Sequence, residues 1–191
     1  NMQILKKLHP MVGQIQRERG LSGAYLGGAS NMDKLRPQRD SVDAKIKEFK
    51  EFAVEAKKED KEKIDELFRT IDQINGYRSM VDGKSVDSRM LVSSYTRVIA
   101  QLLTYYVHSA GLAKELGLSS EIGGLRLLEE GKEYLARLRA NMSVIFAENV
   151  KISDADKANI VGIHSGFEAN LGSPLLQLSP EGSKVVSSFA S

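Results

Sequence analysis

Cysteine is absent from the 191-residue sequence. The chain therefore cannot hold a disulfide framework, a thiolate metal site or a cysteine nucleophile. It also lacks an apolar run of about 18 residues and a visible signal peptide, so we expect no membrane-spanning segment within it. These absences leave both the cytoplasm and the Gram-negative periplasm open as locations.

The sequence also lacks a large excess of charge of either sign. The 27 Lys and Arg residues nearly balance the 25 Asp and Glu residues, and the formal net charge is +2. A nucleic-acid-binding domain usually shows a clustered basic face, whereas the cations here are spread along every segment. We therefore expect this domain to bind no nucleic acid.

Signatures of catalysis are equally scarce. His9, His108 and His164 lie far apart in the sequence, without the spacing of metal ligands. Alternating apolar and polar residues are nearly absent, so no glycine-rich phosphate loop can follow a strand. The sequence predicts no enzyme activity, no cofactor and no metal site.

What the sequence does contain is helical periodicity. Apolar residues recur at steps of three and four through most of the chain, and several such segments approach thirty residues. Turn and cap signals separate them; they lie at Gly27-Gly28, Asn31, residues 82–85, Gly117, Ser153-Asp154, residues 172–174 and Ser179-Pro180. Pro10 is expected to kink the first helix or lie near its start, and Lys57 to Lys63 form either a turn or a solvated helix face.

These segments predict an all-α fold of long antiparallel helices in an up-and-down bundle. A chain of 191 residues is long enough for one such bundle or for two stacked bundle modules. Because it begins at Asn1 and stops at Ser191 without a natural-looking end, we interpret residues 1–191 as one domain excised from a longer protein.

One charged residue lies on an apolar stripe. Arg19 follows Leu8, Val12 and Ile15 at helical spacing, which places its guanidinium toward the bundle core. An unpaired buried charge is strongly unfavourable, so Arg19 needs an anion. That anion is either a carboxylate of the same chain or an external ligand.

The segment around Arg19 resembles a known family. Residues 16–26 (QRERGLSGAYL), followed by Leu35, Gln38-Arg39 and Asp43-Ala44, are similar to the opening of the nitrate- and nitrite-sensing (NIT) domain of bacterial receptors. Residues 95–103 resemble its Y-T-x-L-I-x-x-L-L helix, and residues 132–147 resemble its later K-E-x-x-G-x-E-R-A segment. The similarity covers about residues 5–170, in the family's order, and the first motif is the most specific.

The resemblance implies a sensor domain that binds a small anion, nitrate or nitrite, between two helices. By position, Arg19 (with Arg17 as its neighbour) and Arg139 would clamp the anion, since guanidinium forks suit a planar anion. Ser22 and Tyr25, about one turn beyond Arg19, would complete the pocket or pack between helices, and Glu18 would hold Arg17. The chain departs from the family at Ala136 and Leu138, where the family has Gly and Glu, so Arg139 lacks a carboxylate to orient it.

For the parent protein, the resemblance implies a membrane-anchored chemoreceptor or histidine kinase that carries this domain outside the cytoplasm. Two copies would associate side by side as a homodimer. A cytoplasmic regulator, such as an antiterminator with its RNA-binding part removed, is the second interpretation. A helical interaction module without a ligand is the third, and it predicts that an internal carboxylate pairs with Arg19 and that no pocket exists.

Overall fold

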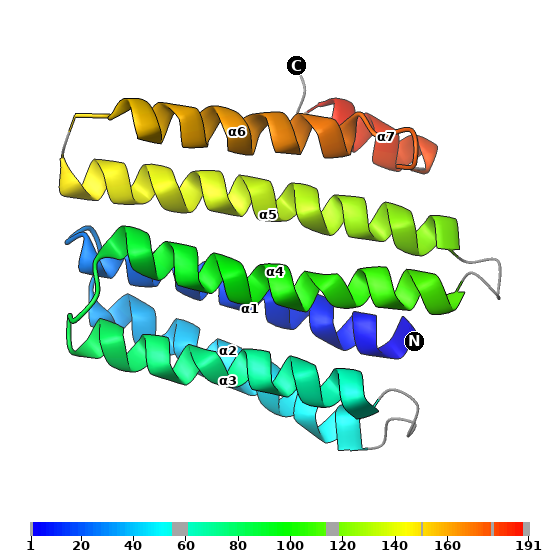
Figure 1. The fold of residues 1–191 in the computed structure, drawn as a ribbon, viewed down its shortest axis with the longest axis horizontal. Coiled ribbons are helices and arrows are strands. Elements are labelled where there is room, and N and C mark those ends of the chain that lie inside the picture. Colours follow the sequence, from blue (N-terminus) through cyan, green and yellow to red (C-terminus); the bar gives the residue numbers. More distant parts are fainter. Residues whose placement is uncertain (1, 55–60, 114–118, 150, 177, 189–191) are drawn as a thin grey trace.

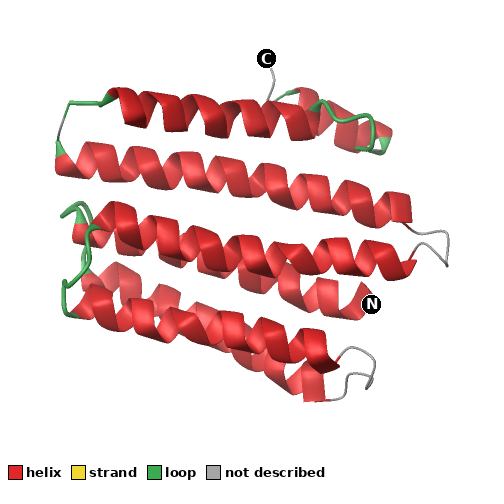
Figure 2. Ribbon diagram, in the orientation of Figure 1, coloured by secondary structure: helices red, strands yellow, loops and turns green. Residues whose placement is uncertain are grey.

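Seven helices and no strand make up the part of the chain that the structure describes (Figures 1 and 2). This computed structural model describes residues 2–54, 61–113, 119–149, 151–176 and 178–188. The helices are α1 (Met2–Leu26), α2 (Met32–Val54), α3 (Lys61–Asp82), α4 (Ser88–Ala113), α5 (Ser119–Glu148), α6 (Asp154–Leu171) and α7 (Pro180–Ser187). Consecutive long helices run in opposite directions, which confirms the predicted all-α up-and-down arrangement.

Local chemistry sets most helix ends where the sequence predicts them. The Asn31 side chain accepts a hydrogen bond from the backbone N–H of Lys34, and Asp87 caps α4 through the N–H of Met90. Ser153 begins α6 with a capping box: its side chain accepts a hydrogen bond from the Asp156 N–H, and the Asp156 side chain accepts one from the Ser153 N–H. Pro10 lies inside α1 and not near its start. Residues 57–60 and Gly117, which carried two of the predictions, fall outside the described residues.

Helices α1 to α4 enclose the main hydrophobic core, and α1 and α4 form its upper layer in Figure 1. Helix α5 packs across α1 and α4, and α6 packs on the far side of α5. A second small cluster, made of Val92, Ala140 and Val144, lies where α5 meets the main bundle. Helix α1 therefore contacts both the lower helices and α5, so its residues can link the two parts.

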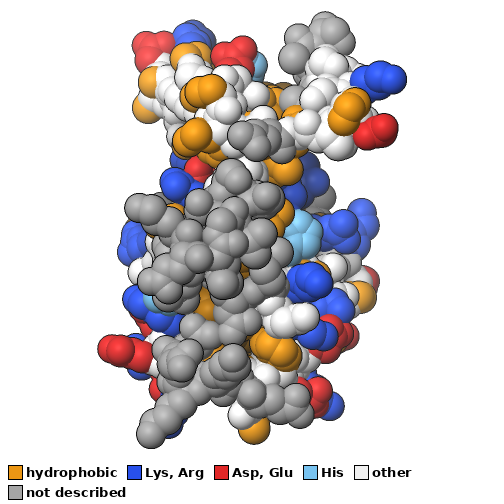
Figure 3. All heavy atoms as spheres, turned by 90° about the vertical axis from the view of Figure 1, so that its right-hand side faces the viewer, with side chains coloured by type: hydrophobic (Ala, Val, Ile, Leu, Met, Phe, Trp, Pro, Cys, Tyr) orange, Lys and Arg blue, Asp and Glu red, His pale blue; other side chains and the backbone are white. Residues whose placement is uncertain are grey.

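The outermost layer, formed by α6 and α7, buries few of its side chains. Ile163 is the buried residue of α6, and hydrophobic side chains show on the surface of the α6–α7 tier at the top of Figure 3. Val161, Leu175 and Val185 are 63%, 70% and 58% exposed. Outside this layer, Val54, Met80, Met90, Leu135 and Phe146 are exposed as well, so the apolar positions of these helices extend beyond the width of helix surface that a neighbouring helix covers.

Candidate functional site

Four consecutive residues of α1, Gln16 to Arg19, point toward three different surroundings. An α-helix advances by about 100° per residue, so successive side chains point in different directions. Gln16 and Arg19 reach Glu133 on α5, and Glu18 reaches Arg78 on α3. Arg17 is exposed. The motif thus lies at the junction between the four-helix core and α5.

Arg19 is fully buried and pairs with a carboxylate of the same chain. Its Nη1 donates to Glu133 Oε1 at 2.5 Å and to Thr96 Oγ1 at 2.9 Å. Its Nη2 donates to Glu133 Oε2 at 3.3 Å, and Gln16 donates to the same oxygen at 2.9 Å. The anion that the sequence analysis required for Arg19 is therefore present within the protein, as Glu133.

Glu18 anchors a second buried network, on the opposite side of α1 from Glu133. It accepts two hydrogen bonds of 2.8 Å from Arg78 and one of 2.8 Å from the Tyr95 hydroxyl. The expectation that Glu18 holds Arg17 is wrong, because the Glu18 side chain points into the α3–α4 side of the core. Arg78 also binds Asp43 at 2.7 Å, so the network joins four helices.

The pKa values of two side chains in the Glu18 network, Tyr95 and Arg78, are raised. Burial raises the pKa of the Tyr95 hydroxyl well above its usual value, and the charge of Glu18 raises it further. Burial by itself would lower the pKa of Arg78, but its bonds to Glu18 and Asp43 outweigh burial and raise it. Both side chains therefore keep their protonated forms, which are the forms that donate to Glu18.

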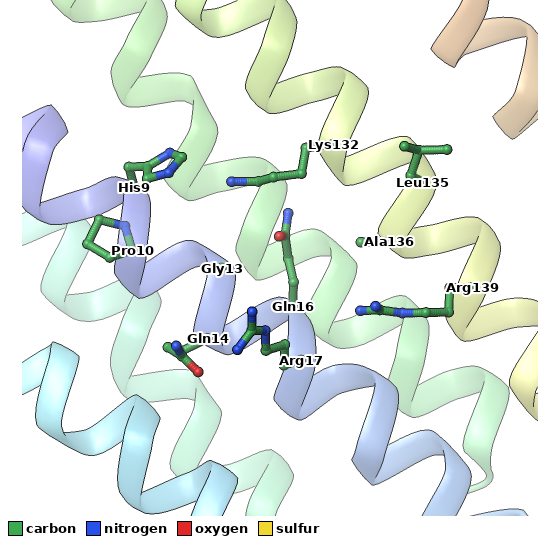
Figure 4. A pocket seen from close by; sticks show the side chains of 10 residues that line it. All are labelled: His9, Pro10, Gly13, Gln14, Gln16, Arg17, Lys132, Leu135, Ala136 and Arg139. Carbon is green, nitrogen blue, oxygen red and sulfur yellow. The ribbon is translucent and has the colours of Figure 1, made fainter. Parts of the chain in front are cut away.

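A groove runs along the line where α1 faces α5. It has a volume of about 550 Å³ and is lined by His9, Pro10, Gly13, Gln14, Gln16, Arg17, Lys132, Leu135, Ala136 and Arg139. In Figure 4, Lys132 and Arg139 extend from α5 toward α1, where Gln16 and Arg17 lie. An adjoining hollow of about 510 Å³ shares Arg17 and Arg139 and continues toward Gln38 on α2. We refer to both together as the α1–α5 groove.

The α1–α5 groove is positively charged. No Asp or Glu lines either hollow, whereas Arg17, Lys132 and Arg139 do. Lys132 forms an ion pair of 2.7 Å with Glu129, which also contacts His9 at 2.5 Å. Arg17 and Arg139 form no hydrogen bond or ion pair with any residue that the structure describes. Two guanidinium groups without a carboxylate partner therefore face one open space.

The predicted site residues separate into two groups. Arg17 and Arg139 line the same groove, whereas Arg19 lies behind it in the interior. Ser22 is fully buried, and its hydroxyl has no partner among the described residues. Tyr25 packs against the main core with Lys84 above its ring, at 5.4 Å from the ring centroid. The structure therefore brings Arg139 together with Arg17, the alternative arginine of the first motif, and leaves Arg19, Ser22 and Tyr25 outside the groove.

Sequence reasoning overlooked Glu133, Thr96 and Lys132. Glu133 and Lys132 stand in the third resembling segment, but a single Lys-Glu pair on a helix usually belongs to a solvated face. Nothing in the sequence pairs Glu133 with a residue 114 positions away. The sequence signal for this contact was indirect: Arg19 on an apolar stripe required some anion.

A smaller cavity lies between α4 and α5. It has a volume of about 240 Å³, and its lining includes Thr96, Leu103, Glu133, Tyr134 and Arg137. Arg137 lies over the Tyr134 ring, at 5.5 Å from its centroid. Glu133 thus borders this cavity, while its partner Gln16 borders the α1–α5 groove. Among the described residues there is no group of three or more His, Asp or Glu side chains that could hold a metal ion.

Across the described segments, no helix is both long enough and apolar enough to cross a membrane. The described segments thus form an all-helical bundle with a cationic groove between two of its helices, α1 and α5.

The family model described as "Nitrate and nitrite sensing" matches residues 10–187, and the chain belongs to this NIT family. A search of the curated proteins finds no match. Among solved structures, the fold is similar to "Structure of the NasR transcription antiterminator", with a TM-score of 0.85 at 18% sequence identity. That similarity covers 97% of this chain and 52% of the other, so this chain spans about half of the NasR chain's length.

Proposed function

We propose that this domain is a sensor that binds a small planar anion, nitrate or nitrite, in the α1–α5 groove and catalyses no reaction. The observation that carries the proposal is the pair Arg17 and Arg139: both line the groove, and neither has a carboxylate partner among the described residues. Membership in the nitrate- and nitrite-sensing family supports the choice of anion.

The chemistry of the groove suits such a ligand. Nitrate is planar and has three acceptor oxygens, and each guanidinium offers parallel N–H donors in one plane. Arg17 on α1 and Arg139 on α5 would approach the anion from opposite walls. Lys132 adds positive charge that attracts anions to the groove, although Glu129 neutralises part of it.

Binding between two helices gives a route to signalling. An anion held by α1 and α5 would favour one packing of these helices over another, and a packed helical interface can pass on a small shift. We propose that the parent protein is a membrane-anchored chemoreceptor or kinase with this homodimeric domain on the extracytoplasmic side.

A cytoplasmic antiterminator is the second candidate for the parent protein. The fold similarity to the NasR transcription antiterminator over 97% of this chain favours it. The sequence on either side of this domain in its gene distinguishes the two candidates. Membrane-spanning segments there would support the receptor, and their absence together with an RNA-binding domain would support the antiterminator.

A ligand-free interaction module is a third possibility, since Arg19 is paired internally as that interpretation predicts. The pocket that it excludes is nevertheless present.

Titration by calorimetry distinguishes the anion sensor from the ligand-free module: we expect saturable heat with nitrate or nitrite, and none with chloride or sulfate at matched ionic strength. The absence of heat from a domain that is folded by circular dichroism would reject the anion sensor.

Substitutions then locate the site. Arg17→Ala and Arg139→Ala should each weaken nitrate binding about tenfold or more, because each removes a charge-assisted contact. Arg69→Ala is the matched control, since it removes an exposed arginine from α3, away from the groove. An equal effect of all three substitutions would indicate a general charge effect instead of a site.

A further inference from the structure

The ion pair between Arg19 and Glu133 separates two hollows of the molecule. Gln16, which donates to Glu133, lines the α1–α5 groove. Thr96, which accepts from Arg19, lines the α4–α5 cavity together with Glu133 itself. The Glu133 carboxylate therefore borders the α4–α5 cavity directly. Through its hydrogen bond from Gln16 it is also connected to the α1–α5 groove.

The Glu133 carboxylate presents Arg19 with the same kind of oxygen acceptors that a small planar anion would present. Its two oxygens accept from both terminal nitrogens of the guanidinium. The fit is incomplete, because the Nη2 contact is 3.3 Å long and the buried Nε has no partner among the described residues. A free anion could approach Arg19 in other orientations, whereas Glu133 is restricted by its attachment to α5.

Glu133 also has a second arginine within reach on its own helix. Arg137 follows four residues later, a spacing at which side chains on a helix are neighbours. Arg137 lines the same α4–α5 cavity as Glu133 and stacks on Tyr134. Within the described part of the chain it has no carboxylate partner. A carboxylate that left Arg19 would therefore find a cation in the cavity that it already borders.

We infer that Arg19 is a second, inner anion position behind the α1–α5 groove and that Glu133 is its tethered competitor: a small anion takes the place of the Glu133 carboxylate on Arg19, and Glu133 turns to Arg137. This inference rests on the proposed anion-binding function. Glu133 then sets the affinity of this inner position, since an anion there must displace an internal carboxylate, and Arg137 stabilises the displaced state. The exchange also couples binding to packing, because it releases the bond between α1 and α5.

Two substitutions test this inference in opposite directions. Glu133→Gln removes the competing charge but keeps the side-chain volume, and nitrate affinity in calorimetry should rise about tenfold or more. Arg137→Gln removes the second partner of Glu133, and nitrate affinity should fall. Glu168→Gln on α6 and Arg69→Gln on α3 make the same chemical changes on exposed helix faces and should leave affinity unchanged. A merely structural role for Glu133 does not predict an increase.

The stability of the variant supplies a second measurement. Glu133→Gln leaves Arg19 as a buried charge without a counterion, so nitrate or formate should raise the melting temperature of this variant more than that of the wild type. If the variant is unfolded in chloride buffer, the inference predicts that nitrate or formate restores its circular dichroism spectrum. Failure of both anions to stabilise or refold it would overturn the inference.

The outcomes separate this inference from the proposed function. If the wild type binds nitrate and folded Glu133→Gln binds it equally or less well, the competitor role is wrong and the sensor remains. If neither form binds nitrate or nitrite, the proposed function fails, and the role of Glu133 as a competitor for those anions fails with it.

Discussion

Arg19 and Glu133 form an ion pair that water barely reaches, since their side chains are 0% and 8% exposed. Removing one partner of such a pair leaves the other charge buried and uncompensated, which costs about 3–5 kcal/mol. We therefore expect Glu133→Ala, which leaves the Arg19 guanidinium without a counterion, to lower the free energy of unfolding by about this amount in urea titrations. Disrupting the partly exposed Arg126–Glu130 pair should cost less than about 1 kcal/mol, and equal losses would contradict the buried-pair assignment.

Tyr95 should make the domain sensitive to alkali. Its folded-state pKa lies above the ordinary value of 10.0, so the unfolded chain releases the phenolic proton first as pH rises. The stability contributed by this group is fully present below pH 10.0 and is lost above it. Unfolding free energies measured across that range should fall more steeply for the wild type than for Tyr95→Phe. Parallel curves would show that Tyr95 is not the responsible group.

At the scale of elements, Gly23 allows α1 to lie close to α4 and α5. A Cβ atom there would stand 2.9 Å from Val92 and 3.4 Å from Val144, whereas one at Gly76 in α3 would meet nothing within 4 Å. Gly23→Ala should therefore destabilise the domain by about 1–3 kcal/mol through overpacking. Gly76→Ala should stabilise it by about 0.5–1 kcal/mol, as expected for a helix interior. Thermal unfolding of both variants measures this, and a stable Gly23→Ala domain would argue against the close approach.

The elements themselves could be predicted from the sequence, because their signals are local. Period-3.6 stripes and caps such as Asn31 and Ser153 act within a few residues, so helices and their ends follow from short windows. The site depends on distant pairs. Arg139 on α5 and Arg17 on α1 were both candidates, but the sequence favoured Arg19 as the partner of Arg139. The sequence could not show that Glu133 already forms an ion pair with Arg19.

At the scale of the whole molecule, burial is unequal between the tiers. Helices α1 to α4 share the main core, whereas α6 packs on α5 and buries only Ile163 among its described residues. Regions with few buried apolar contacts open below the global unfolding free energy. Amide hydrogen exchange should therefore be faster in α6 than in α4. Equal protection in both helices would indicate that α6 is covered in solution, and sedimentation equilibrium would then show whether a second copy of the chain covers it.

The central claim concerns the whole α1–α5 interface: a small anion binds between Arg17 and Arg139. A crystal structure of the domain with nitrate tests it most directly. The account predicts a planar anion in the α1–α5 groove, within hydrogen-bond distance of both guanidinium groups. Nitrate bound only in the α4–α5 cavity or on an unrelated surface, at concentrations that saturate the calorimetric signal, would contradict it.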